Sequence, residues 1–139
     1  MAIQLDRSIV GTEFDRTVFP PITETEIHEY STTSGEPLPP AGGSEGLIAP
    51  PTFVVRLRGK RFMPANLPHL GDAAFDAGKD IEFGVPIRAG DVLTAVSTVH
   101  DIYEKTGRSG TMVFLVLRAV VTNQRNERVA VIDQKMMFR

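Results

Sequence analysis

The side chains best suited to acid–base chemistry in this sequence are three histidines and one loop carboxylate. Histidine is the usual general base near neutral pH, and the chain contains His28, His69 and His100. They show no His-x-x-x-His spacing and have no clustered carboxylates beside them, so the sequence predicts no metal site. Each histidine alone is better explained as a solvated or structural side chain. The carboxylate is Glu36, which stands in a loop rich in proline and glycine.

The common nucleophile and phosphate-binding motifs do not occur. The segment GRSG at residues 107–110 is typical of a hairpin turn, not of the strand-to-helix elbow that exposes a hydrolase serine. The segment GGSEG at residues 42–46 lacks the Lys-Ser/Thr pair of a phosphate loop. The chain has no cysteine, which excludes disulfides, thiolate nucleophiles and cysteine-based zinc sites.

The backbone offers one place where an anion could bind. The segment APPTFVVRLRGKRF, residues 49–62, predicts a buried helix whose first amides have no partner within the helix. Such amides stabilise a developing oxyanion, and a thioester carbonyl would fit. The loop from Gly46 to Ala49 brings a flexible backbone to this helix end. The alternative is a loop that only needs glycine for a sharp turn, and the residues alone leave both possibilities open.

Periodicity predicts the elements that would position these residues. Thr23 and Glu26 form a capping box, so a short helix is expected from about Thr23 to Thr33, ended by Gly35. A first short strand is expected near Arg16–Phe19, and residues 63–78 have the composition of a loop. From Lys79 the period becomes two, which predicts about four antiparallel strands. Their segments are DIEFGVPI, VLTAVSTVHDIY, TMVFLVLRAVVTN and RVAVIDQKMMF.

Length and charge limit the class of protein. A chain of 139 residues predicts one domain, spanning residues 1–139. The net charge of -2 argues against nucleic-acid binding, and no apolar run approaches the ~20 residues that cross a bilayer. No signal peptide is recognisable at the N-terminus, so a cytoplasmic protein is expected. The pattern predicts an α+β hot-dog fold, in which a curved antiparallel sheet wraps around a buried central helix.

Three segments in this order resemble the MaoC-like hydratase/dehydratase family. They are PITETEIHEYSTTSGEP, GLIAPPTFV and the run from GKDIEFGVPIRAGD to VVTNQ, and the resemblance extends from about Gly11 to Arg139. The more specific pieces are APPTF at the expected helix start and P-x-R-x-GD-x-L at Pro86–Leu93. The closest type is the N-terminal, often non-catalytic hot-dog domain or small subunit of that family.

This resemblance implies (R)-specific hydration of a trans-2-enoyl thioester, or the reverse dehydration. The thioester of coenzyme A or acyl carrier protein is then substrate, and no cofactor is implied. Family members use an Asp and a His in a G-D-x-N-P-x-H loop. Here Gly35 and Pro39 match that motif, but Glu36 replaces the Asp, Leu38 the Asn and Ala41 the His. Losing one acid–base group typically costs ~100- to 10,000-fold in rate.

Three interpretations remain open from the sequence. The first is a catalytically degenerate half that shapes the acyl-thioester pocket and forms a heterodimer with an intact MaoC-like subunit. The second is a homodimeric thioesterase or hydratase that uses Glu36 with Asp76 or His69. The third is an acyl-CoA-binding module without chemistry. The candidate catalytic residue is Glu36, and the candidate substrate-binding residues are Gly46, Ala49, Thr52, Phe53 and Arg56.

The cationic run RLRGKR has two explanations. Its side chains Arg56, Arg58, Lys60 and Arg61 are typical of a solvated helix end, which the helix dipole favours. Under the family resemblance they could instead meet coenzyme A phosphates across a dimer seam.

Overall fold

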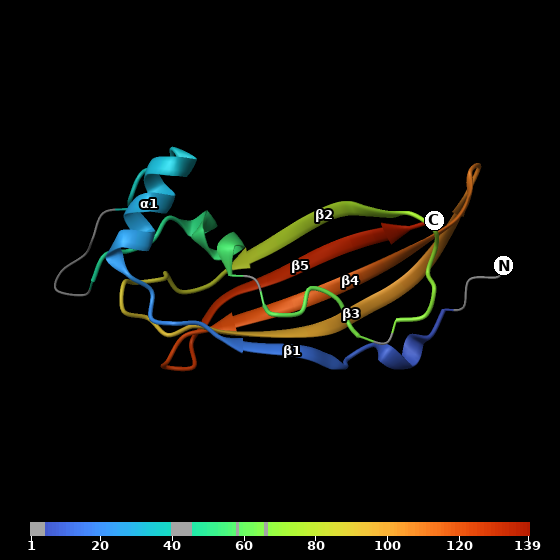
Figure 1. Cartoon of the computed structure of the whole chain (residues 1–139), viewed down its shortest axis with the longest axis horizontal. Coiled ribbons are helices and arrows are strands. Elements are labelled where there is room, and N and C mark those ends of the chain that lie inside the picture. Colours follow the sequence, from blue (N-terminus) through green and yellow to red (C-terminus); the bar gives the residue numbers. More distant parts are fainter. Residues whose placement is uncertain (1–4, 40–45, 58, 66) are drawn as a thin grey trace.

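The computed structural model describes residues 5–39, 46–57, 59–65 and 67–139. Five strands form one antiparallel sheet, and a single α-helix stands beyond one end of it (Figure 1). The strands lie in the order β1-β3-β4-β5-β2. In chain order the elements are η1 (Arg7–Ile9), β1 (Glu13–Val18), α1 (Glu24–Ser34), η2 (Pro51–Arg56), β2 (Ala74–Phe83), β3 (Thr94–Gly107), β4 (Gly110–Thr122) and β5 (Arg128–Phe138).

The capping signal at the start of α1 is confirmed. Thr23 is the N-cap: its hydroxyl accepts from the Glu26 amide at 3.1 Å, and the Glu26 carboxylate accepts from the Thr23 amide at 3.0 Å. Both bonds satisfy amides that the first helical turn leaves without partners. Gly35 ends the helix in the left-handed conformation, with φ 74°. The predicted helix was therefore right to within one residue at each end.

The expected central helix over residues 49–62 is wrong in type and length. The structure has a 3-10 helix of six residues there, Pro51–Arg56. Two causes are visible in the chain. β-branched Val54 and Val55 are poor helix formers, and the Asp15 carboxylate on β1 accepts from the amides of Lys60 and Arg61 at 3.2 and 3.3 Å. Those amides are thus bound outside any helix, although Phe53 and Val54 are buried as the sequence predicted.

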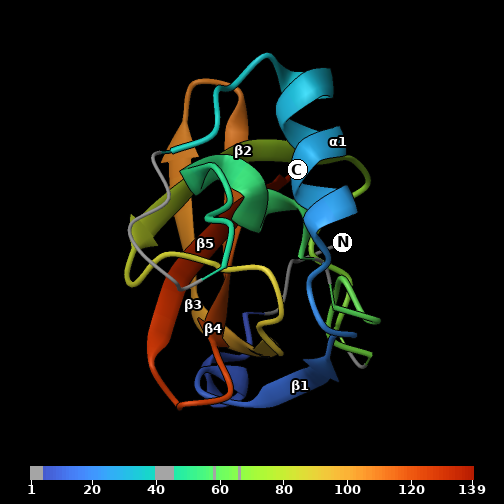
Figure 2. The same cartoon turned by 90° about the vertical axis from the view of Figure 1, so that its left-hand side faces the viewer.

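The sheet confirms the hot-dog prediction and corrects two strands. β4 is the central strand, which agrees with its nearly continuous apolar run, TMVFLVLRAVV. β2 begins at Ala74 rather than residue 80, and it is an edge strand with a bulge between Asp76 and Gly78. β1 covers Glu13–Val18 and forms the opposite, shorter edge. Figure 2 shows the sheet curving around the segment that holds η2.

The core lies on one face of the sheet, which we call the inner face. Side chains of alternate strand positions point there and meet η2, α1 and the loop before β2 in two apolar clusters. The opposite, outer face carries the ion pair between Arg118 and Asp133, whose two hydrogen bonds are both 2.8 Å long. Burial on the inner face fixes the register of β3, β4 and β5, because a slip of one residue would turn their apolar side chains outward.

Candidate functional site

Three polar side chains connect the end of α1 to the start of η2. The Thr52 hydroxyl donates to the Glu36 carboxylate and also shares a 2.6 Å hydrogen bond with the Tyr30 phenol. Two predicted site residues, Glu36 and Thr52, are therefore in direct contact. Tyr30 is an addition to the site that the sequence reasoning missed.

The C-terminus of α1 sets the position of Glu36. The Ser31 hydroxyl donates to the Glu36 carbonyl at 2.6 Å, and the Glu36 amide donates to the Ser34 hydroxyl at 3.2 Å. The residue is half-buried. Its carboxylate is thus held from both sides, by its own backbone contacts to α1 and by Thr52.

Phe53 anchors η2 beneath this group. Its ring is 1% exposed and meets the Tyr30 ring edge-on, with 5.5 Å between centroids. The Arg56 guanidinium lies over the same ring at 4.9 Å from its centroid. Phe53 therefore acts through packing, whereas Arg56 is exposed and keeps its charge at the surface.

A small apolar cavity of about 250 Å³ adjoins the candidate site. Pro39, Ala49 and Val54 line it, together with Phe83 and Ile87. The walls come from the loop after α1, the start of η2 and the segment that follows β2. An acyl group or another apolar group of similar size would fit the chemistry of this lining.

Most backbone amides around the start of η2 already donate a hydrogen bond to a carbonyl of this chain. The Ala49 amide donates to the Ile87 carbonyl at 2.8 Å, and the Phe53 amide donates to the Pro50 carbonyl at 2.9 Å. Pro50 and Pro51 have no amide hydrogen. Within residues 49–53 this leaves the Thr52 amide for a thioester oxygen, so the oxyanion role of this segment stays a prediction.

Gly46 allows the backbones of two loops to lie close together. A Cβ at this position would lie 3.1 Å from the Ala89 carbonyl oxygen, which is tighter than nearly all real contacts. The neighbouring residues pair through a bridge between Ile48 and Arg88. A substrate contact by Gly46 remains a prediction, and the close approach alone accounts for the glycine.

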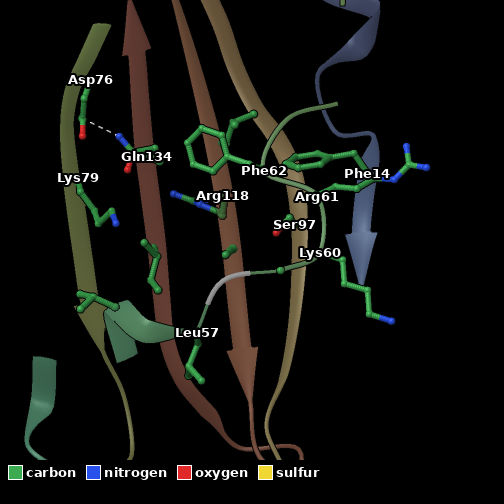
Figure 3. A pocket seen from close by; sticks show the side chains of 15 residues that line it. Phe14, Leu57, Lys60, Arg61, Phe62, Asp76, Lys79, Ser97, Arg118 and Gln134 are labelled. Atoms are coloured by element: carbon green, nitrogen blue, oxygen red, sulfur yellow. Dashed lines mark hydrogen bonds between the residues drawn. The ribbon is translucent and has the colours of Figure 1, made fainter. Parts of the chain in front are cut away.

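A second, larger cavity of about 370 Å³ lies on the other side of η2 (Figure 3). Val54 lines the small cavity, whereas Val55 and Leu57 line the large one. Its floor is the inner face of β4 and β5, and residues 59–62 cross over it. Asp76 and Lys79 stand at the β2 side, where Asp76 accepts from Gln134 at 2.8 Å.

The pKa of the Asp76 carboxyl is held below its usual range. The main cause is the hydrogen bond from the Gly78 amide, and the bond from Gln134 adds to it. Asp76 is therefore a stable carboxylate at neutral pH and a poor proton donor. Its bonds explain the bulge of β2, which turns the side chain toward Gln134 on the neighbouring strand.

The sequence alternative that combined Glu36 with Asp76 or His69 is not assembled within one chain. Asp76 lies near the start of β2, beside the C-terminal end of β5, whereas Glu36 follows α1 at the other end of the sheet (Figure 1). His69 lies in the loop before β2, where its Nε2 is 3.3 Å from Oδ1 of Asp72. His28 and His100 are exposed, and in the described part of the chain neither bonds to Glu36, Thr52 or Tyr30. Ala41 and Arg58 lie outside the described residues.

The segment P-x-R-x-GD-x-L forms a turn that is held by the buried carboxylate of Asp91. Asp91 is 3% exposed, and its carboxylate accepts from the Arg88 amide and the Gln124 side-chain amide, both at 2.9 Å. Gly90 adopts φ 92°, which favours glycine. The motif therefore builds the turn between β2 and β3 and bonds it to the β4–β5 connection.

The model of the FAS1-like dehydratase domain region matches residues 8–132. The chain belongs to this family. A relative of this FAS1-like dehydratase domain is the UPF0336 protein of Streptomyces avermitilis, which is 31% identical over 97% of this chain and 95% of that protein. The resemblance to MaoC-like hydratases and dehydratases that the sequence motifs indicated is thereby confirmed.

Solved structures show the same fold for the FAS1-like dehydratase domain. The MaoC-like dehydratase from Rhodospirillum rubrum superposes with a TM-score of 0.64 at 22% identity, covering 93% of this chain and 91% of that one. One chain of the HadBC (3R-hydroxyacyl-ACP dehydratase) complex from Mycobacterium tuberculosis gives 0.60 at 20% identity, covering 92% and 99%. At these identities the likeness establishes the hot-dog fold. Across the described residues, no helix has the length and apolarity needed to cross a membrane.

Proposed function

We propose that this chain is the catalytically degenerate half of a two-chain (R)-specific enoyl-thioester hydratase or 3-hydroxyacyl-thioester dehydratase. In this role it forms one wall of the acyl-thioester pocket. The partner is a MaoC-like chain with an intact Asp/His loop, and that chain carries the proton transfers. The thioester belongs to coenzyme A or to acyl carrier protein.

The single observation that carries this proposal is the state of Glu36. The carboxylate stands where the family loop has its Asp, but it accepts the Thr52 hydroxyl and has no histidine among its described contacts. Hydration of an enoyl thioester takes one proton from the attacking water and adds one proton at C2, and family members use an Asp and a His for these transfers, of which this loop lacks the His. The apolar cavity beside it suits an acyl wall.

The competing function is thioester hydrolysis with Glu36 alone. One observation favours it: the Thr52 hydroxyl bonds to the Glu36 carboxylate, and the residue before Thr52, Pro51, lines the apolar cavity that would hold an acyl group. In such an enzyme Glu36 would act as base or nucleophile. Its loss would then remove the activity.

Glu36→Gln separates the two functions. The amide oxygen of glutamine still accepts from Thr52, so the local fold is preserved while the carboxylate is lost. In the complex purified from the native host, we expect enoyl-CoA hydration to stay within about threefold of wild type. A thioesterase would instead lose at least ~100-fold in kcat. Glu36→Ala serves as the comparison that also removes the hydrogen bond.

The readout is hydration and thioester hydrolysis, measured on the same preparations of wild type and both variants. A loss of hydration of ~100-fold in Glu36→Gln would show that this chain supplies a catalytic group, and the degenerate-half proposal would then be abandoned.

A further inference from the structure

The sheet has two edges, and they differ in length and in covering. β1 has six residues with a bulge between Glu13 and Asp15, and Asp15 and Thr17 bind the backbone of the loop at residues 60 and 61. β2 has ten residues and pairs only with β5, and every residue of it except Ile81 is exposed. Figure 1 shows it as the outermost strand of the sheet. A long exposed edge offers its outer amides and carbonyls to a further strand.

The regular part of β2 has a clear division of side chains between the two faces. After the bulge, Lys79, Ile81 and Phe83 pair with inner-face residues of β5, which places them on the inner face. Asp80 and Glu82 alternate with them and point outward. Asp80 and Glu82 make no ion pair with any described residue. The outer side of this edge therefore presents two carboxylates two residues apart.

The surroundings reinforce this negative charge. Asp80 lies opposite Asp133 in the ladder, so a third carboxylate adjoins the pair. Arg118 is engaged with Asp133 through both of its hydrogen bonds, and this contact holds the pKa of the Asp133 carboxyl below its usual range. Glu82 adds a smaller charge interaction with the same guanidinium, but both carboxylates of β2 remain exposed. On the same face of β5, Lys135 stands opposite the bulge of β2.

Symmetric pairing of β2 with a second copy is opposed by these charges in every register centred on residues 79–82. In a twofold dimer with a continuous sheet, the axis passes midway between one residue of β2 and the same residue of the second copy, and residues equally far from that residue face each other. An axis at Ile81 places Asp80 opposite Glu82 twice. An axis at Lys79, Asp80 or Glu82 places that charged residue opposite itself. Like charges directly opposite destabilise a strand pair.

We propose that β2 is a charge-selective sheet edge that rejects a second copy of this chain and accepts a strand of a different chain with Lys or Arg facing Asp80 and Glu82. The inner side of that strand is apolar, because it faces Ile81 and Phe83. This inference rests on the proposed two-chain function and identifies the edge that selects the partner. The selection works by repulsion as much as by attraction.

Glu82→Lys is the variant that should reverse the selectivity. With the axis at Ile81 it places Asp80 of each copy opposite the introduced lysine of the other, so two repulsive contacts become attractive. Glu82→Gln is the matched control, which removes the charge without adding a new one. Because the chain has no cysteine, Ile81→Cys adds a register-specific reporter. Residues opposite each other in an antiparallel pair lie within disulfide range.

The experiment measures the fraction of disulfide-linked dimer that forms in I81C, I81C/E82Q and I81C/E82K under mild oxidation. Sedimentation of the same variants gives their mass in solution. We expect I81C/E82K to dimerise about tenfold or more tightly than I81C, with I81C/E82Q between them. Equal cross-linking in I81C and I81C/E82K overturns the proposal. If circular dichroism shows that I81C is unfolded, sedimentation of the single variants E82K and E82Q decides the same question.

A second measurement separates this inference from the proposed function. The wild-type chain, E82Q and E82K are each purified from the native host with the MaoC-like partner identified by mass spectrometry. We expect the amount of partner that co-purifies with E82K to be about one tenth, or less, of the amount that co-purifies with E82Q. Undiminished partner with E82K overturns the edge assignment and leaves the two-chain function standing. Absence of a MaoC-like partner with wild type contradicts the two-chain function, while the cross-linking result still decides whether β2 rejects its own copy.

Discussion

Replacing Phe53 with alanine is expected to lower the free energy of unfolding by about 3–5 kcal/mol. Phe53 is 1% exposed and is the largest of the fully buried side chains. It packs edge-on against Tyr30 and lies under Arg56, so its loss leaves a cavity where η2 meets α1. The measurement is chemical unfolding at equilibrium, with circular dichroism as the probe.

Phe62→Ala is the matched control for Phe53→Ala. The same side chain is removed, but Phe62 is 56% exposed, so the free energy of unfolding should change by less than about 1 kcal/mol. Equal destabilisation by both substitutions would show that η2 is not packed as described. We further expect Phe53→Ala to loosen the Tyr30–Thr52–Glu36 contacts, because Tyr30 loses the ring that supports it.

Replacing Gly84 with alanine is expected to cost about 3 kcal/mol of stability. A Cβ there would lie 2.0 Å from the Arg128 carbonyl oxygen, which cannot move without breaking backbone bonds. Those bonds are from the Gly84 amide to the Val129 carbonyl at 2.8 Å and from the Val85 amide to the Arg128 carbonyl at 3.0 Å. The same segment walls the small cavity.

Gly107→Ala is the control for Gly84→Ala. No atom lies within 4 Å of a Cβ at Gly107, and its backbone is in a region open to all residues. The thermal unfolding midpoint of Gly107→Ala should stay at or slightly above that of wild type, since alanine restricts the conformations of the unfolded chain. A Gly84→Ala variant as stable as Gly107→Ala would contradict the close approach of residue 84 to β5.

Local signals predicted much of the fold because their physics is local. The Thr23–Glu26 capping box fixed the start of α1, and alternation with β-branched residues located β3, β4 and β5. The 3-10 form of η2 could not be predicted, because the Asp15 carboxylate that binds residues 60 and 61 lies 45 positions away in sequence. The first residues of β2 were missed for a related reason: they are exposed and show no regular apolar–polar alternation, and only pairing with β5 makes them a strand.

The candidate site was predicted in part. Glu36 was found by its place in a family loop, and Thr52 by its place at a helix start, but their contact depends on how α1 packs on η2. Tyr30 could not be assigned, since its hydrogen bond to Thr52 spans 22 positions. The charge pattern of β2 was readable in the letters KDIEF, yet its meaning needed the strand order, which makes β2 an edge.

The most direct test of the central claim is hydration of crotonyl-CoA by the chain alone and by the complex recovered from the native host. If the partner carries the proton transfers, as proposed, the isolated chain should hydrate crotonyl-CoA no faster than the uncatalysed background. The complex should exceed the isolated chain by at least ~100-fold. An isolated, homogeneous chain that hydrates crotonyl-CoA at the rate of the complex would contradict the account.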